Sequence, residues 1–260
     1  MSSLLKKGWR PAAVLILLLI LWEGAARLFD VPSWLLPLPT QIAEEAVTGS
    51  ALYAPHILST VMLSATGYFA GISVGVFTAV SLFRVPSLQQ AVYPLIILSQ
   101  NIPVIVLAPL LVIWFGFGMM PKVIVITLVC FFPVTIAALD GFRQTDRDML
   151  HYMKMIGASR RQIFWKLQWP YALPSLFSGL KIAATYSVMG AVISEWLGAS
   201  KGIGVYMTMS SSSFKTDRVF VAIALIMILS LLYFGIITAA ERFALRSRHK
   251  GGSPDGPAHT

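Results

Sequence analysis

Charged residues are scarce in this chain of 260 residues. Asp, Glu, Lys and Arg make up only 12% of it, whereas hydrophobic residues make up 57% and the mean hydropathy is +0.75. A soluble domain carries about twice that share of charge. The apolar runs between the charges are too long for core strands, so the sequence predicts an all-α integral membrane protein.

Cysteine and catalytic motifs are also nearly absent. The one cysteine, Cys130, lies in an apolar run, can form no internal disulfide and is expected to be a packing residue. No GxxxxGK[ST] loop occurs, so the chain is not expected to bind ATP itself. The four histidines are scattered without metal-ligand spacing, and no nucleophile–base pair is visible. We therefore predict no cofactor, no metal and no catalytic residue in this chain.

Six apolar stretches are long enough to cross a bilayer. Their approximate bounds are 12–28, 56–83, 92–115, 121–139, 174–197 and 219–243. The first stretch also fits a signal peptide, but its length favours a retained span, within an N-terminal segment 1–30. An interfacial segment, 31–55, contains a short amphipathic helix from Thr40 and precedes a core of five spans, 56–243. The polar, Gly/Pro-rich tail, 244–260, is predicted to be disordered.

Positive charges are distributed unevenly between the two sides of this predicted bundle. With six spans both termini share one side, which collects fourteen Lys and Arg residues: Lys6, Lys7, Arg10, Arg84, Arg143, Arg147, Lys154, Arg160, Arg161, Lys166, Arg242, Arg246, Arg248 and Lys250. The other side has five: Arg27, Lys122, Lys201, Lys215 and Arg218. The remaining Lys181 lies in a span and is expected to extend to the interface. The positive-inside rule predicts that both termini are cytoplasmic.

Two predicted spans carry small residues at every fourth position. The stripes are Gly67, Gly71 and Gly75 in the second span, and Gly179, Ala183, Ser187 and Ala191 in the fifth. Such stripes let another helix approach closely. They are also compatible with packing against a second copy of the chain.

A few polar side chains lie inside the spans. Ser99, Gln100 and Asn101 lie at mid-depth beside Pro103, and they either bond carbonyls that this proline frees or line a solute path. Three prolines must kink or interrupt this third span: Pro94, Pro103 and Pro109. Glu195, on the stripe of the fifth span, either contacts solute or bonds backbone N–H groups of a glycine-punctuated loop, 194–207. The second reading is favoured, since intramembrane acids nearly always have partners.

The basic, amphipathic stretch TDRDMLHYMKMIGASRRQIFWKLQWP, residues 145–170, lies between two spans. Thr145 and Asp148 fit a capping box that starts a first helix, and Gly157 ends it. Ser159 and Gln162 fit a second capping box, for a helix that Pro170 ends. One face of the first helix is apolar, with Met149, Tyr152, Met153 and Ile156 at helical spacing. A DNA-binding helix-turn-helix is disfavoured, because a loop held between two spans cannot easily reach a major groove.

This stretch resembles the loop signature of bacterial ABC importer permeases. A glycine is followed by nine residues and then by apolar–x–apolar–proline, here Gly157, Leu167, Trp169 and Pro170. The chain departs from the signature where His151, Tyr152 and Met153 replace the usual Glu-Ala-Ala. The resemblance implies type I ABC importer permease architecture, in which a cytoplasmic coupling helix pair, 143–170, docks into an ATP-hydrolysing subunit. It implies coupling contacts at His151, Tyr152, Met153, Met155, Gly157, Ala158 and Arg160.

Other phrases extend the resemblance over about residues 32–243. PSWLLPLPTQI is similar to permeases of the nitrate, sulfonate and taurine group. The phrase FFPVTIAALDGF, residues 131–142, also resembles the family, although Ala137 stands where many relatives have asparagine. The loop and the phrase SGLKIAATYSVMGAVISEWLGASKGIGVYM look most like permeases for thiamine-precursor pyrimidines, with riboflavin carriers as another alternative. The resemblance implies a multi-pass protein of the bacterial inner membrane that imports a small organic solute. It also implies two permease copies, two subunits that bind ATP and Mg, a periplasmic or lipid-anchored solute-binding protein, membrane lipid around the spans, and no nucleic acid.

Two other functional classes of membrane protein remain compatible with the sequence. A secondary transporter driven by an ion gradient is expected to show inverted repeats and buried titratable groups, and here Glu195 is the only acid well inside a span. A membrane anchor for another enzyme does not explain the basic loop. The resemblance therefore favours the ABC importer permease.

Overall fold

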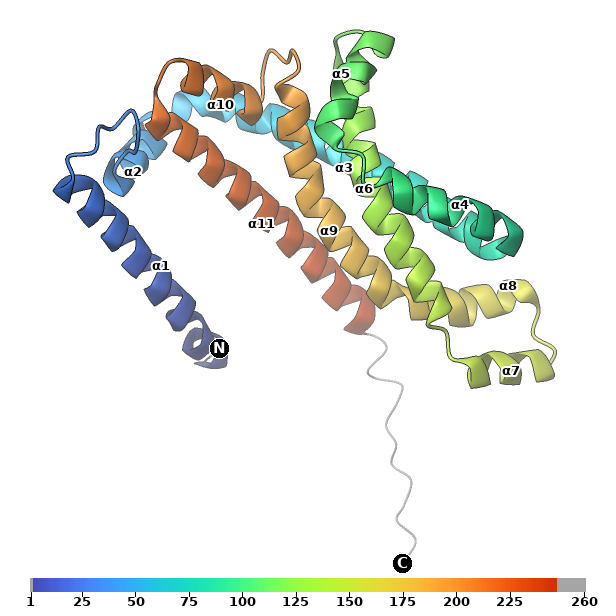
Figure 1. Ribbon diagram of the computed structural model, residues 1–260. Helices are drawn as coiled ribbons and strands as arrows, with labels where there is room; N and C mark the ends of the chain where they lie inside the picture. Colours follow the sequence, from blue (N-terminus) through green and yellow to red (C-terminus); the bar gives the residue numbers. More distant parts are fainter. Residues whose placement is uncertain (1, 247–260) are drawn as a thin grey trace, which may run out of the picture.

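Helices are the regular secondary structure of the described chain. The computed structural model describes residues 2–246, and among these there is no β-strand (Figure 1). The helices are α1 (Ser2–Leu28), α2 (Pro39–Thr48), α3 (Ser50–Arg84), α4 (Pro86–Ser99), α5 (Val104–Phe115), α6 (Met119–Arg143), α7 (Arg147–Met155), α8 (Arg160–Ile163), the π-helical turn η1 (Phe164–Gln168), α9 (Trp169–Glu195), α10 (Ile203–Ser212) and α11 (Thr216–Arg246). The predicted tail, 244–260, begins inside α11, and its residues 247–260 lie outside the described part.

Among residues 2–246, five helices are long and apolar enough to cross a membrane, and the bent pair α4–α5 supplies a sixth crossing if it is one span. This confirms the predicted all-α class. Figure 1 shows the outer ends of α1 and α11 on the same side as α7 and α8, which we call the loop end. The short helices α2 and α10 lie at the opposite side, the far end. The shared side of the termini and the loop agrees with six crossings.

The glycine stripe of α3 packs closely against α6. A Cβ atom on Gly67 would lie 2.4 Å from Cβ of Ile126, and one on Gly71 would lie 2.5 Å from Cβ of Cys130. Real Cβ atoms do not approach so closely, so only glycine allows α3 and α6 this separation. Cys130 is fully buried in this contact, as expected of a packing residue.

The second stripe packs α9 against a neighbouring face of α6, since Ile126 lies close to both Gly67 of α3 and Gly190 of α9. A Cβ atom on Gly179 would lie 2.6 Å from Cβ of Ala137, and Ala183, Ser187 and Ala191 are fully buried. Ala137 thus lies in a helix–helix contact. Both stripes are used within the chain, and neither is left for a second copy.

The predicted end of a helix at Pro170 is wrong. From Arg160 to Glu195 the chain is one helical rod of 36 residues, which includes η1. Pro170 has no N–H to continue a regular hydrogen-bond ladder. Before it, the wider π turn lets the N–H of Trp169 donate to the carbonyl of Phe164, five residues back. The proline therefore follows a bulge in a continuous helix and does not end it.

The predicted third span, 92–115, is two helices rather than one. The axes of α4 and α5 differ by 100°, and the break between them contains Gln100–Pro103. Pro103 is the N-cap residue of α5, whereas Pro94 and Pro109 lie inside helices. Of the three prolines, Pro103 interrupts the span.

Ion pairs tie the peripheral helices to the core. Lys181 of α9 has an ion-pair partner that the sequence did not indicate, since its Nζ lies 3.0 Å from a carboxylate oxygen of Glu241 on α11. At the far end, Arg218 Nε lies 2.9 Å from Glu45 of α2.

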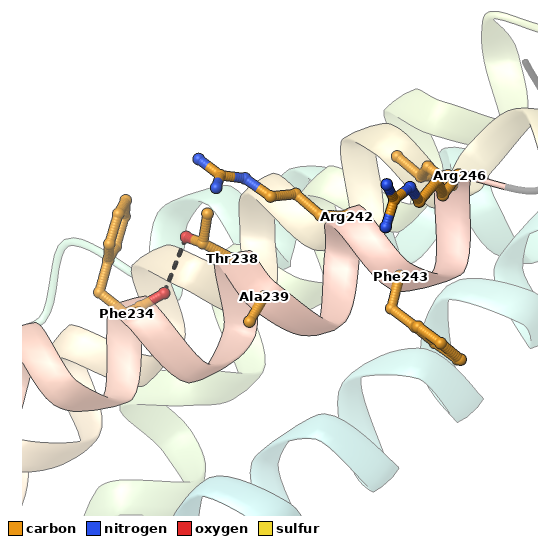
Figure 2. A pocket seen from close by; sticks show the side chains of 8 residues that line it. Phe234, Thr238, Ala239, Arg242, Phe243 and Arg246 are labelled. Carbon is orange, nitrogen blue, oxygen red and sulfur yellow. Dashed lines mark hydrogen bonds between the residues drawn. The ribbon is translucent and has the colours of Figure 1, made fainter. Parts of the chain in front are cut away.

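Figure 2 shows the loop end of α11, where the Thr238 hydroxyl donates to the carbonyl of Phe234. An open groove of about 870 Å³ at this end is lined partly by Arg242 and Arg246.

Candidate functional site

The exposed helix α7 begins at a local cap. The Asp146 carboxylate accepts hydrogen bonds from the backbone N–H groups of Asp148 (2.8 Å) and Met149 (3.1 Å). The predicted start at Thr145 is therefore wrong by one residue, because its hydroxyl donates instead to the carbonyl of Phe142 at the end of α6. Gly157, with φ of +76°, ends the α7 turn in a left-handed conformation that favours glycine.

The second helix of the loop starts as the sequence predicts. Ser159 Oγ accepts from the N–H of Gln162, and the Gln162 side chain accepts from the N–H of Ser159 at 2.8 Å. This reciprocal pair satisfies two N–H groups at the start of α8. It also marks the point where the 36-residue rod begins.

The apolar face of α7 is uncovered in the isolated chain. Met155 is 78% exposed, Ile156 61% and Tyr152 55%. Of the other residues predicted to couple to an ATPase, His151, Gly157 and Arg160 are exposed, whereas Met153 and Ala158 are half-buried. Exposed large apolar side chains on a short helix that also carries Arg147 and Lys154 are typical of a protein-interaction surface.

An aromatic cluster attaches the loop to the helices of the core. The ring of Phe164 lies 5.7 Å from that of Phe142 on α6, which in turn stacks on Phe83 of α3 at 4.8 Å. The Arg84 guanidinium lies 4.8 Å above the Phe164 ring. Packed rings therefore connect η1, which continues α8, to α3 and α6.

Ser99, Gln100 and Asn101 line a hollow of about 690 Å³ between the α4–α5 break and the helices α6 and α9. Two of the three also bond carbonyls in the last turns of α4: Ser99 Oγ donates to Ile96 (3.0 Å) and Asn101 Nδ2 donates to Ile97 (2.8 Å). The hollow wall opposite carries Tyr186, Met189, Phe131 and Phe132. The same geometry is therefore compatible with both roles: bonding backbone carbonyls and lining a solute path.

Glu195, the fourth candidate path residue, lies apart from this hollow. It is 1% exposed at the far end of α9, where one carboxylate oxygen accepts from Thr60 Oγ1 (2.7 Å) and the other from the N–H of Gly204 (2.8 Å). The bond from the Gly204 N–H agrees with the expectation that Glu195 bonds backbone N–H groups of the loop that follows it. The predicted loop around it is shorter than expected, because Ile203–Ser212, which includes most of the serine run, form α10.

Two members of this cluster were missed from the sequence. His56 Nδ1 lies 3.1 Å from the nitrogen and 2.9 Å from the carbonyl oxygen of Gly202, and Thr60 Oγ1 accepts from the N–H of Ile203 at 2.8 Å. Their spacing in the sequence could have indicated that His56 and Thr60 act together, since residues four apart share one helix face. Among the described residues, no group of acids, histidines and cysteine has metal-site geometry.

Replacing Gly204 with alanine should displace α10 from α9. The new Cβ would lie 2.5 Å from the backbone carbonyl oxygen of Val192, which cannot rotate away. We expect a destabilisation of about 1–3 kcal/mol, seen as a lower melting temperature in detergent. Gly190→Ala is the control, because its Cβ would meet Ile126 at an ordinary 3.5 Å. Equal melting temperatures for the two variants would contradict the assigned packing.

The fold and the loop agree with one family of membrane proteins. The family profile described as "Binding-protein-dependent transport system inner membrane component" matches residues 71–246, a stretch that includes the coupling loop, α9 and α10. The chain belongs to this family. It is an ABC importer permease subunit, and it spans the membrane to carry a small solute.

Several relatives of this permease have named solutes. It is 36% identical to the formylaminopyrimidine transport permease protein ThiX of Halalkalibacterium halodurans, over 92% of this chain and 96% of that one. It is 30% identical to the riboflavin transport system permease protein RibX of Chloroflexus aurantiacus, over 89% and 87%. The taurine transport system permease protein TauC of Escherichia coli is 29% identical, over 84% and 82%.

Solved ABC transporters share the fold of this permease. A chain of an amino acid ABC transporter aligns with a TM-score of 0.63 and 14% identity, over 75% of this chain and 95% of that one. A chain of the methionine transporter MetNI, in an inward-facing form, aligns with a TM-score of 0.59 and 17% identity, over 71% and 94%. At these identities the likeness concerns the fold alone.

Proposed function

We propose that this permease imports a formylated aminopyrimidine, a precursor of the thiamine pyrimidine, and that two ATP-binding subunits drive it. The uncovered apolar face of α7 carries the second part of the proposal. Tyr152, Met155 and Ile156 expose a surface that a soluble partner can bury, and α8 joins it to the core. ATP and Mg belong to those partners, since this chain has no phosphate-binding loop.

The hollow beside the α4–α5 break suits a neutral heteroaromatic solute. Ser99, Gln100 and Asn101 offer hydrogen-bond donors and acceptors, and Tyr186 and Phe131 offer aromatic surface for a planar ring. No Lys or Arg is among the described residues that line it. Nitrate, or the sulfonate group of taurine, would lack a positive partner there, which favours a pyrimidine over the sulfonates.

Riboflavin is the second candidate solute. It is also a planar heteroaromatic ring, and a riboflavin permease is among the relatives at 30% identity. The ThiX relative is more similar, at 36% identity over nearly the whole of both chains. The pyrimidine is therefore the first solute to test.

The positive-charge bias and the family suggest the other parts of the assembly. In this proposal two permease copies enclose the path, and a solute-binding protein delivers the solute to the far end. The loop end faces the cytoplasm, where ATP is available, because the sequence assigns the excess of Lys and Arg to the side of the loop. Closure of the ATP-binding subunits moves the two loops, and the path switches between its two openings.

The test begins with affinity purification of the tagged permease from mild detergent. An ATP-binding subunit should co-elute, and the complex, reconstituted with its solute-binding protein, should accumulate formylaminopyrimidine in vesicles only with ATP. Taurine and riboflavin serve as competing solutes. Uptake that persists without ATP would favour the ion-gradient transporter, and preferred uptake of taurine would refute the assigned solute.

A further inference from the structure

The amino end of α10 is capped by side chains of other helices. The backbone N–H groups of Ile203 and Gly204 are bonded by Thr60 of α3 and Glu195 of α9, at 2.8 Å each, and His56 of α3 lies against Gly202. A helix normally satisfies these first N–H groups with a side chain at its own N-cap. Gly202 has no such side chain, so the cap of α10 exists only while α3 and α9 stay in place.

Thr60 occupies the centre of this arrangement. It is fully buried, donates its hydroxyl proton to Glu195 at 2.7 Å, and accepts from Ile203. One hydroxyl thus links three helices. Gly202 is packed so closely that a Cβ atom on it would lie 2.1 Å from Cδ of Glu195. Because buried N–H groups and a buried carboxylate are costly without partners, the helices are expected to separate reluctantly here.

Glu195 is also the last residue of the long rod. The helix from Arg160 to Glu195 is continuous, and 36 residues correspond to about 54 Å. Its other end is the capped start of α8, next to the uncovered face of α7. The α10 cluster and the coupling loop are therefore the two ends of one structural element.

We infer that Thr60 and Glu195 are positioning residues that make α10 move together with α3 and α9, so that an event at the far end reaches the coupling loop. This rests on the proposed function, in which a solute-binding protein meets the far end. The surface of α10 and its following turn is available to such a partner, since Met209 and Phe214 are exposed. Thr60 and Glu195 do not contact solute. They connect α10, which the binding protein would contact, to α9.

The test uses the complete complex with its ATP-binding subunits in vesicles. Thr60→Val keeps the shape of the side chain but removes the hydroxyl, so Ile203 loses its acceptor and Glu195 its donor. We expect the stimulation of ATP hydrolysis by the loaded binding protein to fall about tenfold, within the usual range of coupling between sites. Basal hydrolysis and the yield of assembled complex should remain. Thr60→Ser keeps the hydroxyl and should retain the stimulation.

A cross-link supplies an independent check. Ser59 Oγ lies 3.3 Å from the carbonyl oxygen of Lys201, so cysteines at 59 and 201, in a Cys130→Ser background, should tie the turn before α10 to α3. Oxidation should restore stimulation to Thr60→Val. Normal stimulation of Thr60→Val, or equal loss in Thr60→Ser, would overturn the inference. Absence of any stimulation in the unmodified complex would instead contradict the proposed function.

Discussion

Leucine in place of Gly71 should strongly destabilise the folded permease. A Cβ atom at this position would lie 2.5 Å from Cβ of Cys130 and 3.0 Å from the backbone carbonyl oxygen of Thr127. The backbone oxygen cannot move without the helix, so α3 and α6 must separate along their contact. We expect a cost of about 3 kcal/mol or more, which lowers the melting temperature in detergent by roughly 10 °C. Fluorescence-detected size exclusion after heating measures it.

Gly235→Leu is the matched control for this prediction. Gly235 also lies in a long apolar helix, α11, but nothing lies within 4 Å of a Cβ atom built on it. This variant should elute and melt like the unmodified chain. Cys130→Gly, combined with Gly71→Leu, should recover part of the loss because it opens space opposite the new side chain. A stable Gly71→Leu protein would show that α3 and α6 do not pack as described.

Aspartate in place of Met155 should remove the ATP-binding subunit from the complex. Met155 is the most exposed apolar residue of α7, at 78%, and in the proposed assembly a partner covers it. A carboxylate buried at such a contact lacks a partner and costs several times RT. We expect recovery of the ATP-binding subunit in pull-down to fall at least about tenfold, equivalent to about 1.4 kcal/mol. Transport should be lost with it.

The same substitution at Met120 separates a specific effect from a general one. Met120 is 62% exposed, but it lies at the start of α6, at the end of the span away from the loop. Met120→Asp should insert, assemble and retain the ATP-binding subunit. If Met155→Asp retains the subunit as well, α7 is not the surface that the partner covers.

The crossings and the caps of the loop were accessible from the sequence because their signals are local. An apolar run needs only its length to predict a span, and Ser159 and Gln162 are three residues apart. The glycine stripes likewise predicted close contacts. The identity of the partner helix was not accessible, since many apolar faces are similar, and packing alone selected α6 for both stripes.

The polar groups of the spans were less predictable. Glu195 pairs with Thr60, 135 residues earlier, and Lys181 pairs with Glu241, 60 residues later. No sequence pattern connects such positions. The break at Pro103 was expected as a kink or interruption, but the 100° angle between α4 and α5 depends on what each helix packs against. Pro170 was misread because a π turn absorbs it without ending the helix.

The sequence by itself determined that this protein is an all-α membrane protein with five or six candidate spans, that its basic loop is a pair of capped helices, and that it resembles ABC importer permeases. Hydrophobic length, capping and charge bias act over a few residues, so they can be read directly. The tertiary structure alone decided that one rod joins the loop to Glu195, and that α3 and α9 cap α10. Those features depend on hydrogen bonds and close approach between distant segments, which form only after the helices pack.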